Sequence, residues 1–164
     1  MNWKQPKVYA VRHKDEATRA ASRSGGIFTA LSDQVLSNGG VVYGCVLTDE
    51  FDAVHIRTDN EENRNRMRGS KYIQSKLGDT FKSVKTDLDA KRSVLFSGTS
   101  CQVAGLKKYI GKEYDNLFCV DIVCHGVPSK KYGRHICVGK SRKCTLKLQV
   151  WTSEIRKTLD GMIM

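Results

Sequence analysis

Residues 93–126 restrict the fold most strongly, because a buried-strand pattern, a helix pattern and another buried-strand pattern follow one another directly. The run "SVLFSG" at 93–98 is apolar up to its glycine, and "QVAGLKKYI" at 102–110 has helical spacing. The run "LFCVDIV" at 117–123 is apolar again and leads into a Cys-His-Gly turn. Continuous apolar runs of this length are typical of strands buried on both faces. This order of elements predicts an α/β fold.

The first 47 residues give a similar pattern. The segment "KVYAVRH" (7–13) alternates apolar and polar residues, which predicts a half-buried strand. Residues 22–40 indicate a Ser/Gly loop, a helix and a stop at Gly39-Gly40, and "VVYGCVL" (41–47) predicts a strand. The order is that of a βαβ unit whose glycine-rich turn lies where helix N-termini bind phosphate. The spacing is not GxGxxG, so it does not establish a Rossmann fold.

The middle of the chain completes the predicted domain. The segment "AVHIRT" (53–58) predicts a hairpin partner for 41–47, and the charged run "DNEENRNR" predicts the start of a helix. Phe81, Val84 and Leu88 share one face of a further amphipathic helix. We therefore expect a mixed, largely parallel sheet with flanking helices.

Length and charge narrow the class of protein. A chain of 164 residues suits one domain, and no window approaches the roughly 18 apolar residues of a membrane span. The N-terminus lacks an apolar stretch typical of secretion signals, which predicts a cytoplasmic location. The net charge of +11 raises nucleic acid as a partner, but residues 132–164 carry seven Lys/Arg against two Asp/Glu, a surplus of five. Because no aromatic-basic stacking pattern appears either, we expect no nucleic-acid partner.

Polar groups follow three of the predicted strands, at the ends where ligands gather in α/β sheets. If the strands are parallel neighbours, these turns form one crevice. The groups are Ser22, Ser24, Gly25 and Gly26; residues 98–102; and Cys124, His125 and Gly126. The loop "MRGSKYIQS" adds partners for phosphate or aromatic rings, namely Arg68, Ser70, Lys71, Tyr72, Gln74 and Ser75. The glycines equally fit a simple turn, and the cations equally fit a solvated surface.

The cysteines fall into two kinds. Cys45 and Cys119 lie inside apolar strands, which favours buried, inert thiols. Cys101 and Cys124 lie in polar, glycine-bearing turns after strands, and a thiol near a helix N-terminus suits redox chemistry, nucleophilic attack or iron–sulfur ligation. These roles stay open on the pattern alone. His125 is a candidate for proton transfer or ligation only because it adjoins Cys124, whereas His13 and His55 fit ordinary surface or strand positions.

Four motifs in this order resemble the coenzyme F-420 hydrogenase/dehydrogenase beta-subunit family. They are "SRSGGIFTAL…GGVVYG", "MRGSKYIQSKLGDTFKSVK", "VLFSGTSCQVAGLKKYI" and "YDNLFCVDIVCHGVPS", and together they cover about residues 7–131. The resemblance implies an oxidoreductase subunit that binds FAD and a [4Fe–4S] cluster and passes electrons between a hydride carrier, such as a deazaflavin, and one-electron centres. It also implies a redox partner subunit or a ferredoxin-like protein. Bacterial members often accompany polysaccharide-biosynthesis genes.

The resemblance also implies a role for individual residues. Cys101 and Cys124 match the recurrent cysteines of the family and are the implied cluster ligands. The implied cofactor-binding residues are Ser24, Gly25, Gly26, Arg68, Gly69, Ser70, Lys71, Tyr72, Gln74, Gly98 and Thr99. The chain departs from the family pattern at Ser100, where proline is usual, and at Arg23, where serine is usual.

The ends of the chain depart from the family as well. Members often begin with a ferredoxin-like module and continue well beyond "CHGVPS", so we expect residues 1–131 to be a central piece of an incomplete domain.

When residues 132–164 are back-translated and read in a shifted frame, the permitted codons spell a motif that the family carries downstream of "CHGVPS". Two Asp residues of this motif are forced by the codons, one at Trp151-Thr152 and one at Met162-Ile163. This predicts a frameshifted tail in which Cys137 and Cys144 carry no selected function, the alternative being a genuine basic helix. Either an electron-transfer subunit or an inactive fragment without cofactor fits this sequence.

Overall fold

The computed structural model describes residues 6–50 and 52–127 and confirms the α/β class. The predicted tail, 132–164, lies outside these residues. In chain order the elements are α1 (Glu16–Ser22), α2 (Ile27–Ser37), β1 (Val41–Leu47), β2 (Ala53–Thr58), α3 (Glu61–Arg66), α4 (Thr80–Asp89), β3 (Val94–Thr99), α5 (Ser100–Ile110) and β4 (Leu117–Ile122). No helix in the described part of the chain has the length and apolarity that a membrane crossing requires.

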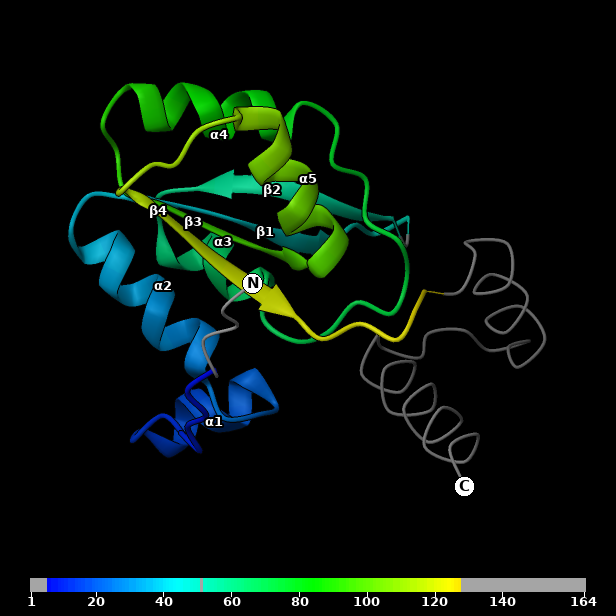
Figure 1. Ribbon diagram of the computed structural model, residues 1–164. Coiled ribbons are helices and arrows are strands. Elements are labelled where there is room, and N and C mark those ends of the chain that lie inside the picture. Colours follow the sequence, from blue (N-terminus) through cyan, green and yellow to red (C-terminus); the bar gives the residue numbers. More distant parts are fainter. Residues whose placement is uncertain (1–5, 51, 128–164) are drawn as a thin grey trace.

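The sheet has the strand order β2-β1-β3-β4 (Figure 1). β1 and β2 form the predicted antiparallel hairpin, from Val42 paired with Thr58 to Leu47 paired with Ala53. β3 is parallel to both of its neighbours, β1 and β4. The prediction of a mixed, largely parallel sheet is therefore confirmed.

Helices cover both faces of the sheet (Figure 1). On one face α4 and α5 contribute Val84, Leu88 and Leu106 to a cluster around Phe96. On the other face Val35 of α2 packs with the side chains of Val42 and Leu95. Burial of these side chains is the main favourable contribution to folding.

The prediction of a strand at residues 7–13 is wrong. This segment is neither helix nor strand, and the side chains of Val8 and Tyr9 are 89% and 71% exposed. The alternating pattern was present, but the sheet offers no neighbour with which the segment pairs. The N-terminal βαβ unit is consequently absent. The polar stretch after it forms α1, which begins where the Asp15 carboxylate accepts a hydrogen bond from the Thr18 N–H at 2.6 Å.

The prediction that β4 is a buried strand is also wrong. β4 lies at the edge of the sheet, where Phe118 and Ile122 are 52% and 48% exposed. An apolar run predicts a strand, but burial depends on what lies beside it. The opposite edge differs, because the backbone of Lys76 covers β2 by donating to the carbonyl of Ala53 and accepting from the N–H of His55.

Arg64 of α3 is fully buried and joins α3 to α2. Its guanidinium donates to the Thr29 carbonyl at 3.0 Å and to the Ser32 hydroxyl at 2.8 Å, and it pairs with the Asp33 carboxylate at 2.5 Å. A buried charge is tolerated only when it is paired and hydrogen-bonded in this way. Arg64 therefore holds α3 against α2.

A second buried network joins β1, β2 and α4 through Asp87. Its carboxylate accepts from the Tyr43 hydroxyl at 2.5 Å and from the Arg57 guanidinium at 2.8 and 3.1 Å. Burial alone would raise the pKa of Asp87, but the hydrogen bonds from Arg57 and Tyr43 outweigh it and lower the pKa below its ordinary value of 3.8.

The substitution Arg64→Ala should lower the free energy of unfolding by about 3 kcal/mol, because it leaves a void and removes the donors that satisfy α2. Urea denaturation followed by circular dichroism measures the change. The control is Arg66→Ala, on the same helix but exposed, which should change stability by less than about 0.5 kcal/mol. Equal effects of the two substitutions would contradict the role of Arg64.

Asp87 should make the protein acid-sensitive. Because its folded-state pKa lies below 3.8, its stabilisation is complete above that pH and is lost as the pH falls through the folded-state pKa. Asp87→Asn should reduce stability at pH 7 by about 2 kcal/mol and flatten its dependence on pH in this acid range. Urea midpoints from pH 7 downward test this. Asp59→Asn is the control, because Asp59 pairs with the same Arg57 but is 57% exposed, and it should leave the profile unchanged.

Candidate functional site

Because β1, β3 and β4 are parallel, their carboxyl ends lie along one side of the sheet. Here that side is called the edge, and it is distinct from the outer strands β2 and β4. The β3–β4 register ends with Thr99 opposite Ile122. Cys101 and Cys124 each follow two residues later on their own segments. Since neighbouring strands lie about 4.8 Å apart, the two thiols emerge at neighbouring points of this edge. The group at 22–26 follows no strand and instead precedes α2.

Cys101 is an exposed, free thiol in the first turn of α5. Its sulfur lies 3.2 Å from the Thr99 hydroxyl oxygen. The Thr99 N–H donates to the Gln102 side-chain oxygen at 3.0 Å, which holds the turn. A side chain at position 98 would crowd that contact, because a Cβ on Gly98 would lie 3.0 Å from the same oxygen. Gly98 and Thr99 therefore shape the turn that presents the thiol.

Cys124 is the second exposed, free thiol. The Gly126 N–H lies 3.4 Å from its sulfur and donates to it. Gly126 has φ +121°, a conformation that favours glycine, so the Cys-His-Gly turn needs glycine for its geometry. His125 is exposed beside it.

A hydrogen bond ties the two thiol-bearing segments together. The Ser100 hydroxyl, at the start of α5, donates to the carboxylate of Asp121, near the end of β4, at 2.8 Å. Sequence reasoning missed Asp121, although it is a charged residue within an otherwise apolar strand.

The loop after α3 bridges α2 and α5 across this edge. The Arg68 guanidinium donates to the Thr29 hydroxyl of α2 at 3.1 Å. Further along, the Ser75 hydroxyl accepts from the Gln102 amide of α5 at 2.7 Å. Gly69 has φ +78° and open space around it, so the loop turns sharply there. The structure thus brings two predicted motifs, 68–75 and 98–102, to one edge of the sheet.

Lys71 already uses its donors within the protein. Its ammonium donates to the carbonyls of Arg66, Met67 and Arg68 at 3.2, 2.7 and 2.9 Å, which caps the C-terminal end of α3. Burial lowers its pKa to about 8, against an opposing effect of Cys45. The contacts give Lys71 a structural role, and a contact with phosphate remains a prediction. Of the other loop residues, Ser70 and Gln74 are exposed and Tyr72 is half-buried.

The glycine turn before α2 packs against the N-terminal segment. A Cβ on Gly25 would lie 3.1 Å from the Val11 carbonyl oxygen, and one on Gly26 would lie 2.9 Å from the His13 side chain. Gly26 also has φ +76°, which favours glycine. Close packing alone therefore requires these two glycines, whereas Ser24 is exposed.

Cys45 and Cys119 are partly buried, and burial raises the pKa of each thiol. A raised pKa disfavours the thiolate that binds metals, which agrees with the interpretation of both as inert. Among residues 6–50 and 52–127, no three His, Cys, Asp or Glu side chains gather as a metal site. The structure thus offers two thiols at the edge, and Cys137 and Cys144 fall outside the described residues.

Comparison with known proteins agrees with this arrangement. Residues 8–82 match the family model of coenzyme F420 hydrogenase/dehydrogenase, beta subunit N-terminal. Over these residues the chain is similar to this family. The resemblance inferred from the motifs is thereby confirmed. No curated protein matches the chain.

A solved structure is similar in fold. A chain of the F420-reducing [NiFe] hydrogenase complex from Methanosarcina barkeri, in a xenon derivative, superposes with a TM-score of 0.62 at 19% sequence identity. The match covers 79% of this chain and 49% of that one, so this chain spans about half the length of the hydrogenase chain.

Asp121→Ala should slow cross-linking of Cys101 to Cys124 by a bifunctional thiol reagent about fivefold. The substitution removes the hydrogen bond from Ser100, which contributes about 1 kcal/mol to holding the two segments together. Mass spectrometry of the linked peptides measures the rate. Asp115→Ala removes an exposed carboxylate before the same strand and should leave the rate unchanged. An unaltered rate in Asp121→Ala would rule out the proposed alignment.

Proposed function

We propose that the chain forms part of a flavin- and iron–sulfur-dependent electron-transfer subunit, which passes electrons between a hydride carrier such as a deazaflavin and iron–sulfur partners. The match of residues 8–82 to the beta-subunit family model supports an oxidoreductase role. The observation that carries the proposal is the register of β3 and β4. It pairs Thr99 with Ile122, so that Cys101 and Cys124 follow at the same edge of the sheet.

The two exposed thiols fit an iron–sulfur cluster as two of its ligands. Thiolates are the usual ligands of such clusters, and a [4Fe–4S] cluster commonly takes four. Because the described residues supply only Cys101 and Cys124 at this edge, the remaining ligands come from another segment or a partner subunit in this proposal. Asp121 and Ser100 hold the two segments in register.

The neighbouring loop fits a flavin better at some residues than at others. Arg68 is fixed beside the start of α2, and its guanidinium is suited to a diphosphate. Open space surrounds Gly69 at the turn, and Ser70 and Gln74 are exposed. Lys71 instead fixes the loop, because its donors are used on the α3 carbonyls.

The flavin, when bound, would supply two-electron chemistry with the hydride carrier and one-electron chemistry with the cluster. The residues of this chain position both groups. The loop bonds to α2 through Arg68 and to α5 through Ser75, so a flavin held by it would lie beside the thiol-bearing turn of α5.

Anaerobic purification of the full chain, followed by reconstitution with iron, sulfide and FAD, tests the proposal. The wild-type protein should bind iron, sulfide and flavin, measured by chemical analysis and by absorbance. Cys101→Ser and Cys124→Ser should each reduce bound iron by at least about tenfold, because each removes a ligand.

Cys119→Ser is the matched control, because it removes a thiol from β4 on the face that α5 covers. It should retain wild-type iron. A folded wild-type protein that binds neither iron nor flavin would instead establish the inactive-fragment alternative. If Cys101→Ser binds as much iron as the wild type, the assignment of Cys101 as a cluster ligand is refuted, while the rest of the proposal is not affected.

A further inference from the structure

Each of the two exposed thiols has a hydrogen-bond partner within its own turn. The Thr99 hydroxyl oxygen lies 3.2 Å from the Cys101 sulfur, and the Gly126 N–H donates to the Cys124 sulfur at 3.4 Å. The two partners differ in kind, because one is a side chain and the other is backbone. Only the Thr99 hydroxyl can therefore be removed by a substitution that keeps the shape of the side chain.

The direction of the hydrogen bond between Thr99 and Cys101 depends on the state of the sulfur. In a free thiol either group could donate. A cysteine that binds a metal is a thiolate, which has no proton and only accepts. The hydroxyl must then donate, and the described residues offer its proton no other acceptor. The turn thus already contains a donor for a thiolate at position 101.

The backbone that carries this hydroxyl is held in place. The Thr99 N–H donates to the Gln102 side-chain oxygen at 3.0 Å, and the Gln102 amide donates to the Ser75 hydroxyl at 2.7 Å. Thr99 is also the last residue of β3, where it is paired with Ile122 of β4. The sheet and α5 together therefore keep the hydroxyl beside the sulfur.

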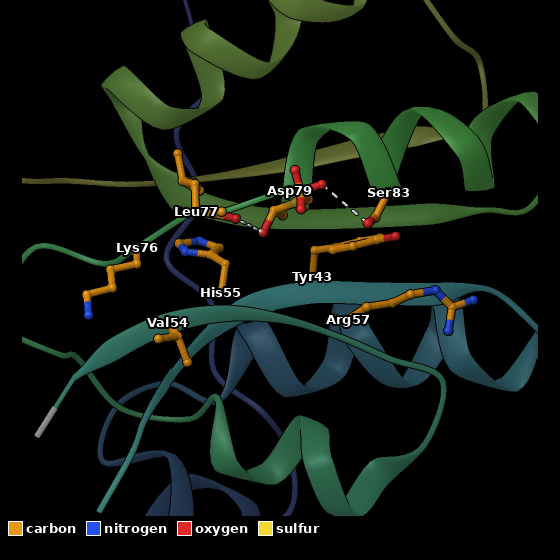
Figure 2. A pocket seen from close by; sticks show the side chains of 10 residues that line it. Tyr43, Val54, His55, Arg57, Lys76, Leu77, Asp79 and Ser83 are labelled. Carbon is orange, nitrogen blue, oxygen red and sulfur yellow. Dashed lines mark hydrogen bonds between the residues drawn. The ribbon is translucent and has the colours of Figure 1, made fainter. Parts of the chain in front are cut away.

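A pocket of about 320 Å³ lies beyond Ser75, between the β1–β2 hairpin and the start of α4 (Figure 2). The chain that follows Ser75 contributes Lys76, Leu77 and Asp79 to its lining. Neither of the two thiols lines the pocket, and neither does Thr99. A substitution at position 99 therefore changes the surroundings of Cys101 without changing the lining of the pocket.

A hydrogen bond to a thiolate ligand affects the reduction potential of an iron–sulfur cluster. Reduction adds one electron, so the negative charge shared by the ligand sulfurs increases. A donor beside one sulfur stabilises this larger charge more strongly, because hydrogen bonds to charged groups are the stronger ones. The N-terminal end of α5, an 11-residue helix, adds a partial positive charge that acts in the same direction.

We propose that Thr99 tunes the reduction potential of the iron–sulfur cluster by donating its hydroxyl proton to the Cys101 thiolate, which makes reduction of the cluster more favourable. This inference rests on the proposed function, because it requires Cys101 to be a cluster ligand. Thr99 is one of the residues expected to bind a cofactor, and its contact with the Cys101 sulfur ties it to the cluster and not to the flavin. It acts through Cys101 and is not itself a ligand.

A redox titration of the reconstituted full chain, followed by electron paramagnetic resonance of the reduced cluster, tests this role. Thr99→Val has nearly the same shape but no hydroxyl, and it should lower the equilibrium constant for one-electron reduction about fivefold. Its iron content should equal that of the wild type. Thr99→Ser keeps a hydroxyl and should titrate as the wild type does. If Thr99→Val does not fold, Thr99→Ala removes the same hydroxyl and should show the same fall.

Thr86→Val is the control elsewhere in the fold, because it removes an exposed hydroxyl that donates to the Lys82 carbonyl within α4. It should leave the titration unchanged, and circular dichroism checks that each variant is folded. Three results would refute the role of Thr99 while the proposed function stands: an unchanged titration in Thr99→Val, a titration of Thr99→Ser that matches Thr99→Val, or loss of iron from folded Thr99→Val. A wild-type protein that binds no iron would overturn both.

Discussion

The parallel pairing of β3 with both of its neighbours is the constraint on which the rest of the structure depends. It places the carboxyl ends of β1, β3 and β4 at one edge. The connections from β1 to β3 and from β3 to β4 step in the same direction across the sheet, so right-handed crossovers place α4 and α5 on the same face. The side chains at that edge meet for this topological reason, although they are far apart in sequence.

The sequence predicted those features that depend on local patterns. The apolar run at 94–99 and the helical spacing after it gave β3 and α5, and the thiols at their turns were found from the same order. It failed where the outcome depends on neighbours. Residues 7–13 alternate correctly but have no strand to pair with, and β4 is apolar but lies at an edge. Likewise, Lys71 binds carbonyls whose position only the folded α3 provides.

The segment from Met67 to Thr80 links the two faces of the sheet. It leaves α3 on one face, contacts α2 through Arg68 and α5 through Ser75, and then reaches the pocket beside β2. The same segment covers the β2 edge at Lys76.

The two edges of the sheet are unequal. The backbone of Lys76 pairs with the β2 edge at Val54, whereas no strand lies on the outer side of β4 within the described residues. An uncovered strand is a template on which another strand pairs. A strand added there, from this chain or another, would extend the sheet beyond β4. In such an extended sheet Cys101 and Cys124 would lie near the middle, with protein on both sides of them.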